Sequence, residues 1–126
     1  MRLAHTKRRT WLVSMFAIVG AVVGTTVLTG AKTNTAVDIT VTNSSQRAIV
    51  HLYLAPPSDP NNWSADQLNG STIPSGGSRQ LSNVNCSGSI RVIAEDDGGC
   101  FVYNVVSCDG NQNWEISDGT PRDCGD

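Results

Sequence analysis

Histidine is scarce in this sequence. The chain contains two, and only His51 lies outside the first 31 residues. A hydrolase built on a Ser–His–acid set would therefore depend on His51, yet the chain contains no Gly-x-Ser-x-Gly motif. The four cysteines form no Cys-x-x-Cys motif, which argues against a structural zinc site. The sequence thus predicts no catalytic residues and no enzyme, and it places His51 at a surface or half-buried strand position.

Basic residues are also scarce once the N-terminus is set aside. Four of the nine lysines and arginines lie within residues 1–31, which contain none of the eleven acidic residues. Residues 32–126 therefore keep five basic and eleven acidic side chains, a net charge of −6. An acidic surface without a basic cluster argues against nucleic acid, and against an anionic membrane surface, as the partner.

Residues 1–31 have the three parts of a secretory signal peptide. A basic start precedes an uncharged, mostly apolar stretch over residues 11–28, and small residues then precede a cleavage site after Ala31. A second site, after Ala36, is less suitable because the bulkier Asn34 stands at its −3 position. The alternative is an uncleaved membrane anchor, since the apolar stretch approaches the ~20 residues that span a bilayer. Position 31 holds no cysteine, so a lipid anchor is not expected.

The remainder of the chain shows strand patterns and no long helical pattern. Residues 32–36 form a short polar leader, and residues 37–126 are long enough for a single domain. Residues 48–54 are apolar on both faces, which predicts a central strand. Further strands are expected over residues 37–42, 78–84, 89–94, 100–107 and 114–117. The pattern predicts an all-β fold, a small antiparallel Greek-key or immunoglobulin-like sandwich of about six to seven strands stapled by disulfides.

The even number of cysteines in a short exported chain predicts two disulfides. The strongest hairpin signal in the chain lies between two of these cysteines, and a register with Glu95 opposite Gly99 places Cys86 opposite Cys108. Side chains at paired positions of neighbouring strands are close enough for a bridge, so we predict Cys86–Cys108. The remaining cysteines, Cys100 and Cys124, then pair by elimination, and the other two connectivities stay open.

A loop rich in proline and asparagine, residues 55–77, separates the second and third predicted strands. Loops carry recognition on β scaffolds, and tryptophan is enriched at binding hot spots. Trp63 is therefore the main candidate for a binding contact, with Asp59, Asn61 and Asp66 as polar neighbours. The alternative is that Trp63 folds back and covers one end of the small core.

Acidic and amide side chains supply the oxygen ligands that calcium prefers, so calcium is the one cofactor considered. Residues 109–113 begin like a calcium-binding loop, but Trp114 stands where the loop needs glycine and Thr120 stands where it needs glutamate. An EF-hand is therefore excluded, and two looser oxygen clusters remain: Glu95, Asp96 and Asp97, and Asp109, Asn111 and Asn113. We expect the acids to lie in turns or exposed positions, and we expect no cofactor.

A series of short motifs follows along residues 37–117. Trp63, Asp66 and Leu68 form a Trp-x-x-Asp-x-Leu loop motif, with Ser64 in place of a glycine, and a Pro-Gly turn follows loosely at Pro74 and Gly76. A Cys…Asp-Gly…Cys hairpin comes next, formed by Cys86, Arg91, Asp97, Gly98 and Cys108. This order resembles a group of small exported bacterial β-sandwich proteins of unassigned function. Ser89 departs from that pattern, and Cys100 and Cys124 are additional. The resemblance implies a β-sandwich, supports the Cys86–Cys108 bridge and implies no activity.

The sequence as a whole predicts an exported, non-enzymatic binding or structural module, either secreted or located in the periplasm or cell envelope. Its expected partner is an unidentified protein or glycan, with membrane contact only through an uncleaved N-terminal segment. Two alternatives are a secreted hydrolase or other small enzyme, and an envelope protein tethered by an uncleaved N-terminal helix.

Overall fold

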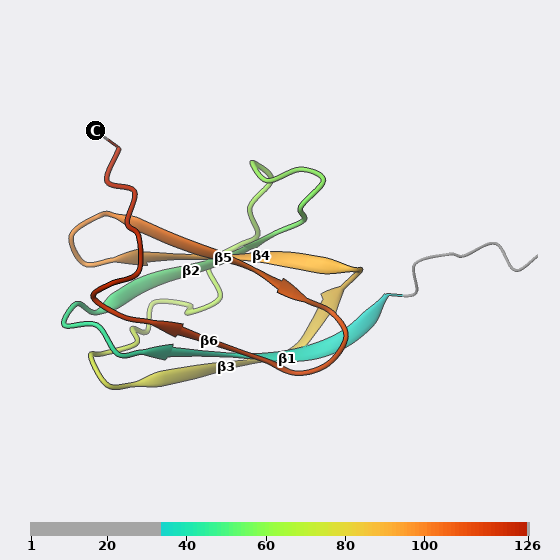
Figure 1. The fold of residues 1–126 in the computed structure, drawn as a ribbon, viewed down its shortest axis with the longest axis horizontal. Coiled ribbons are helices and arrows are strands. Elements are labelled where there is room, and N and C mark those ends of the chain that lie inside the picture. Colours follow the sequence, from blue (N-terminus) through green and yellow to red (C-terminus); the bar gives the residue numbers. More distant parts are fainter. Residues whose placement is uncertain (1–33, 126) are drawn as a thin grey trace, which may run out of the picture.

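The computed structural model describes residues 34–125, which fold into two three-stranded sheets packed as two layers (Figure 1). The predicted signal segment and the first two residues of the predicted leader lie outside the described residues, and the last two residues of that leader, Thr35 and Ala36, already belong to the first strand. The six strands are β1 (Thr35–Asn43), β2 (Ile49–Ala55), β3 (Ser78–Cys86), β4 (Ser89–Asp96), β5 (Phe101–Ser107) and β6 (Gln112–Ile116). Within the described part, no helix is both long and apolar enough to cross a membrane.

The strands are ordered β3-β1-β6 in one sheet and β2-β4-β5 in the other. The chain changes sheet at every connection except the β4–β5 hairpin, so the two sheets are built from interleaved segments of the chain. All neighbouring strands are antiparallel except β1 and β6, which run parallel. The predicted disulfide-stapled β-sandwich is confirmed, and the parallel pair is a departure from a purely antiparallel arrangement.

The core forms where the alternating side chains of the two sheets meet. In β1 the residues Val37, Ile39 and Val41 are at most 3% exposed, while their neighbours are half-buried, as the period of a strand requires. Burial of each such side chain stabilises the fold by roughly 1.5–3 kcal/mol. Asn43 continues the buried row, and its amide donates to the carbonyls of Arg47 and Ile73 at 2.7 and 3.0 Å. This polar side chain therefore ties the β1–β2 turn to the long loop.

The predicted register of the β4–β5 hairpin is wrong, because each residue of β4 pairs two positions further along β5 than expected. Glu95 pairs with Phe101, not with Gly99, and the turn consists of residues 97–99. A three-residue hairpin loop needs a left-handed conformation at its last position, and Gly99 adopts it with φ of 77°. Placing Gly99 there moves Asp96 into the strand, opposite Cys100, which explains the shift.

Both predicted disulfides are present, but Cys86–Cys108 does not arise from the register that suggested it. Cys86 is the last residue of β3 and Cys108 directly follows β5, so the bridge joins the two sheets at one end of the sandwich. The second bridge, Cys100–Cys124, ties the C-terminal tail to the start of β5. The first bridge thus joins strands that share no ladder, and the second fastens a segment that belongs to no strand.

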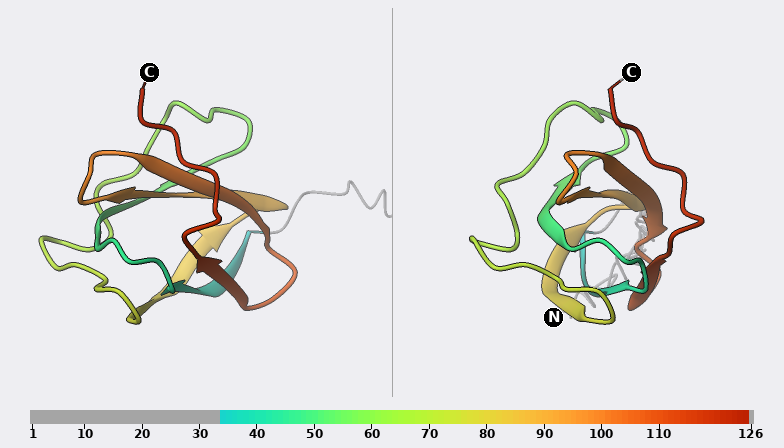
Figure 2. Two further views of the ribbon diagram at one scale, coloured as in Figure 1. Left: turned by 60° about the vertical axis from the view of Figure 1, so that its left-hand side comes forward. Right: turned by 90° about the vertical axis from the view of Figure 1, so that its left-hand side faces the viewer.

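Strand β2 is an edge strand, which corrects the prediction that it is central. The long loop covers its open edge: Ser64 Oγ and Asp66 Oδ1 accept the backbone N–H groups of Leu54 and Leu52 at 2.9 and 3.1 Å. Figure 2 shows this loop running along one side of the sandwich from β2 to β3. Because these backbone N–H groups are already bonded, this stretch of the edge is closed to pairing with another chain.

Candidate functional site

The outer face of the β2-β4-β5 sheet, directed away from the core, carries most of the aromatic side chains described. The registers align Tyr53, Ile93 and Tyr103 in one row across the three strands. A second row aligns His51, Glu95 and Phe101. Side chains in the same row of a sheet are neighbours, so rings from β2 and β5 flank the central strand β4.

Trp63 lies between these flanking rings. Its ring centroid is 5.2 Å from that of Tyr53 on β2 and 5.4 Å from that of Phe101 on β5. Because β4 runs between those two strands, the indole lies above β4, where Ile93 is only 1% exposed although it faces outward. The indole Nε1 donates to the carbonyl of Pro60 at 2.9 Å, which fixes its orientation. We call Tyr53, Trp63, Phe101 and Tyr103 the aromatic face.

The aromatic face remains accessible although its rings contact one another. Trp63, Tyr103 and Val105 are the three large hydrophobic side chains described as exposed, at 41, 51 and 55%, and all three belong to this side of the sheet. The guanidinium carbon of Arg91 lies 4.1 Å from the ring centre of Tyr103, so a cation covers part of that ring. Exposed apolar side chains gathered on one face are typical of an interaction surface.

Charged groups lie directly beside the rings. His51 Nδ1 is 2.8 Å from Asp66 Oδ2, and this hydrogen bond raises the pKa of His51 above 6.5 against a smaller opposing effect of burial. Glu95 lies opposite His51 in the same row and adds to the rise. Burial, reinforced by Glu95 and Asp66, raises the pKa of Tyr53 above 10.0. The face therefore combines aromatic rings with groups that donate and accept hydrogen bonds.

The predicted binding loop divides into three parts. Trp63 is exposed and lies on the outer face of the sheet, against Tyr53 and Phe101, so it stays the candidate for a binding contact. Asp66 is structural, since its Oδ1 accepts from the backbone N–H groups of Leu52 and Leu68. Asp59 and Asn61 are exposed in a turn and make no side-chain hydrogen bond within the described residues.

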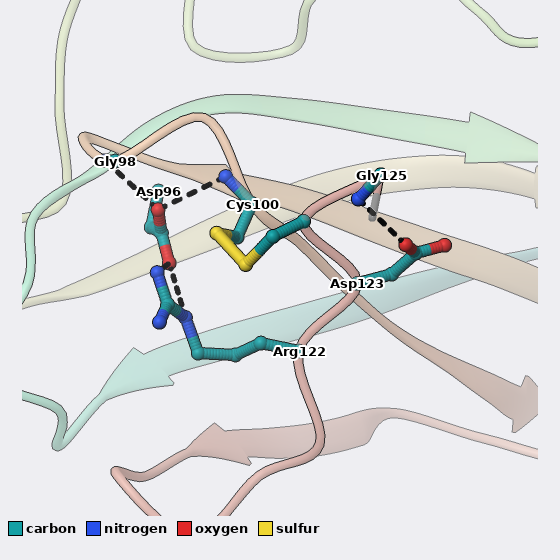
Figure 3. Close-up of a disulfide and its surroundings, with 7 residues drawn as sticks. Asp96, Gly98, Cys100, Arg122, Asp123 and Gly125 are labelled. Atoms are coloured by element: carbon teal, nitrogen blue, oxygen red, sulfur yellow. Dashed lines mark hydrogen bonds and ion pairs between the residues drawn. A yellow bond between two sulfur atoms is a disulfide. The ribbon is translucent and has the colours of Figure 1, made fainter.

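The acidic cluster expected at residues 95–97 does not converge. Glu95 is directed to the outer face and Asp97 lies in the exposed turn. Asp96 was expected in an exposed turn, but it ends β4 and is 4% exposed. Its Oδ2 accepts from Arg122 Nε at 2.7 Å, and its Oδ1 accepts from the N–H groups of Gly98 and Cys100 (Figure 3). Burial opposes ionisation, but these hydrogen bonds outweigh it and lower the pKa of Asp96 below 3.8.

The second set of candidate oxygen ligands lies around the β5–β6 connection. Asn111 Oδ1 accepts from the backbone N–H of Asp38, Asn113 lies within β6, and Asp109 is exposed after β5. In residues 34–125, no three acidic, histidine or cysteine side chains lie close enough together to hold a metal ion. Glu95, Asp96 and Asp97 are thus directed to different surroundings, and Asn111 Oδ1 is already used by a backbone N–H group.

Sequence reasoning missed Tyr53, Arg91, Phe101, Tyr103 and Val105 as members of one surface. A signal was present, since Phe101, Tyr103 and Val105 alternate along one face of β5, and Tyr53 shares a face of β2 with His51. Only the pairing of both strands with β4 brings these side chains together. Comparison of the chain with protein-family models, with curated proteins and with solved structures found no match.

Proposed function

We propose that this protein is an exported, non-enzymatic binding module that contacts its partner through the aromatic face. The observation that carries the proposal is the gathering of Trp63, Tyr103 and Val105 on one side of the β2-β4-β5 sheet. Trp and Tyr offer large contact areas, and Trp63 is already held in place by Pro60 and by the rings beside it. A side chain ordered before binding loses little entropy when the partner arrives.

Export is supported by the signal-like N-terminus and by the two disulfides. Disulfides persist in oxidising compartments, so we place the protein outside the cell or in the periplasm or cell envelope. The mass of the exported protein tests this part of the proposal. A chain that begins at residue 32 supports a cleaved signal, whereas an intact N-terminus in the membrane pellet indicates a tether.

The binding role is tested with two matched variants of the exported protein. Tyr103→Thr removes an exposed ring from β5, and Asn113→Thr changes an exposed position of β6 on the opposite sheet. Threonine is favoured in strands, so both variants should fold. Retention on cell-envelope and extracellular material should fall for Tyr103→Thr and stay unchanged for Asn113→Thr. Equal retention of the two variants would remove the support for the aromatic face.

A hydrolase is the second candidate, because the His51–Asp66 pair supplies two members of a Ser–His–acid set. Within the described residues no serine, threonine or cysteine side chain hydrogen-bonds to the His51 ring, and Asp66 already holds the backbone of Leu52 and Leu68. We therefore assign the pair a structural role. A measured turnover that is abolished by His51→Gln would favour the hydrolase instead.

A further inference from the structure

The aromatic face lies outside the clefts of the described part, which bears on the shape of its ligand. Clefts in the described part, of about 490, 500 and 260 Å³, are lined by other residues and by none of the four members of the aromatic face. Small molecules are usually held in concave sites that surround them. An exposed sheet face is instead suited to an extended ligand, which gains contact by its length across the rings.

The chemistry of the face favours a ligand that is apolar and hydroxylated at the same time. Glu95 lies on the central strand between His51 and Phe101, and Arg91 lies on the same strand beside Tyr103. An apolar protein surface placed here would strip water from these charged groups without replacing their hydrogen bonds. A sugar ring presents C–H groups to an aromatic ring and hydroxyl groups around its edge, which satisfies both kinds of neighbour.

The charge around the aromatic face disfavours negatively charged polymers as ligands. Glu95 and Asp66 lie beside the rings, and residues 32–126 carry a net charge of −6. Polyanions such as nucleic acids and acidic polysaccharides are repelled by such a surface. The two basic side chains on the face are already engaged within the protein, since the Arg91 guanidinium is stacked on Tyr103 and His51 is paired with Asp66.

From this shape, chemistry and charge, and resting on the proposed binding role, we infer that the aromatic face binds an uncharged polysaccharide chain. The chain lies across β2, β4 and β5. Its sugar rings contact Trp63 and the part of Tyr103 that Arg91 leaves exposed, and its hydroxyl groups are hydrogen-bonded to Glu95 and His51. Binding is multivalent: each sugar–ring contact contributes modestly, and a longer chain binds more tightly because it makes more of these contacts.

Depletion onto insoluble polymers tests the inference directly. The exported protein is mixed with cellulose or chitin as uncharged probes, and with cross-linked pectate as an acidic one. We expect retention on at least one uncharged polymer, weaker retention on pectate, and a roughly tenfold loss of affinity in Tyr103→Thr. Asn113→Thr should bind as the unmodified protein does. Stronger binding to pectate, or unchanged binding of Tyr103→Thr, would overturn the inference.

Tryptophan fluorescence gives an independent readout with soluble oligosaccharides. Trp63 is 41% exposed and open to quenching by acrylamide, whereas Trp114 is 6% exposed and shielded. Cellohexaose or chitohexaose should protect the quenchable signal, and Trp63→Phe identifies that signal as Trp63 while keeping a ring at the site. Failure of every uncharged glycan to bind, with envelope retention still dependent on Tyr103, would refute the polysaccharide and leave the binding role intact.

Discussion

Arg122 donates from Nε to Asp96 Oδ2 at 2.7 Å, although the two residues lie 26 positions apart in the chain. Asp96 is almost fully buried, and the Arg122 side chain is 28% exposed. The two following residues fasten the same tail. Asp123 pairs with the backbone of Phe101. Cys124 is bonded to Cys100, and Figure 3 shows this disulfide beside the Arg122–Asp96 pair. Three neighbouring residues thus hold the tail by an ion pair, by backbone hydrogen bonds and by a covalent bond.

Replacing Arg122 should destabilise the fold. Arg122→Gln leaves the buried carboxylate of Asp96 without its cation, and breaking a buried pair in this way costs roughly 3–5 kcal/mol when both groups are fully buried. Because Arg122 is partly exposed, we expect a loss of about 2 kcal/mol. Urea unfolding measures the difference, and Arg79→Gln on β3 serves as a control that removes an arginine from an exposed strand position. A loss as small as that of the control would contradict the proposed role of the pair.

The Asp96 carboxylate should also make stability depend on pH. Its pKa is lower in the folded state than the ordinary value near 3.8, so ionisation stabilises the fold above that pH. The contribution is lost as the pH falls through the folded pKa. The free-energy gap between the unmodified protein and Asp96→Asn should therefore narrow below about pH 4. Unfolding curves between pH 2 and 7 measure it, with Asp109→Asn as a charge-matched control on an exposed acid.

His51 should respond to pH in the opposite direction. Its pKa is raised above 6.5, so the His51–Asp66 pair stabilises the fold below that pH and the contribution is lost as the pH rises through the raised value. Melting curves of His51→Gln should accordingly differ from those of the unmodified protein more at pH 5.5 than at pH 8.5. NMR titration of the ring should give a midpoint above 6.5, and Asp66→Asn should lower it. An unchanged midpoint in Asp66→Asn would refute the pairing.

The disulfide connectivity can be checked by non-reducing peptide mapping. Combined trypsin and chymotrypsin digestion should link the Cys86 peptide to the Cys108 peptide, and the Cys100 peptide to the Cys124 peptide. Sequence separations of 22 and 24 residues give loops whose closure is worth about 3 kcal/mol each. Paired Cys→Ser variants should each lose stability on that order. A peptide that joins Cys86 to Cys100 would contradict both bridges, because it would place the end of β3 beside the start of β5 and not beside its end.

The strand pattern could be predicted because alternation is local. Residues 37–42 alternate strictly, and the structure places them in β1 with the apolar side chains in the core. The disulfide partners were also predicted, although the register behind the prediction was shifted by the left-handed Gly99. A turn conformation of one glycine thus decides which residues of two strands face each other, and composition alone does not reveal it.

The burial of Asp96 and the aromatic face could not be predicted because both depend on distant partners. Asp96 looks like a turn residue until Arg122 is brought beside it by the tail. Trp63 looks like a loop residue until its loop folds over β4 and meets Phe101, which lies 38 positions further along the chain. Local pattern identifies the elements, whereas these sites arise from contacts between elements.

The parallel pairing of β1 with β6 also bears on how the chain folds. Ile39 is paired with Gln112, so this ladder closes a loop that includes nearly the whole sandwich, whereas the β4–β5 hairpin closes over a few residues. Closing a long loop costs more chain entropy and is slow, so the hairpin should form early and the β1–β6 ladder late. Until that last ladder forms, β1 is held in its sheet by β3 alone, so the β3-β1-β6 sheet is completed only when the C-terminal part of the chain arrives.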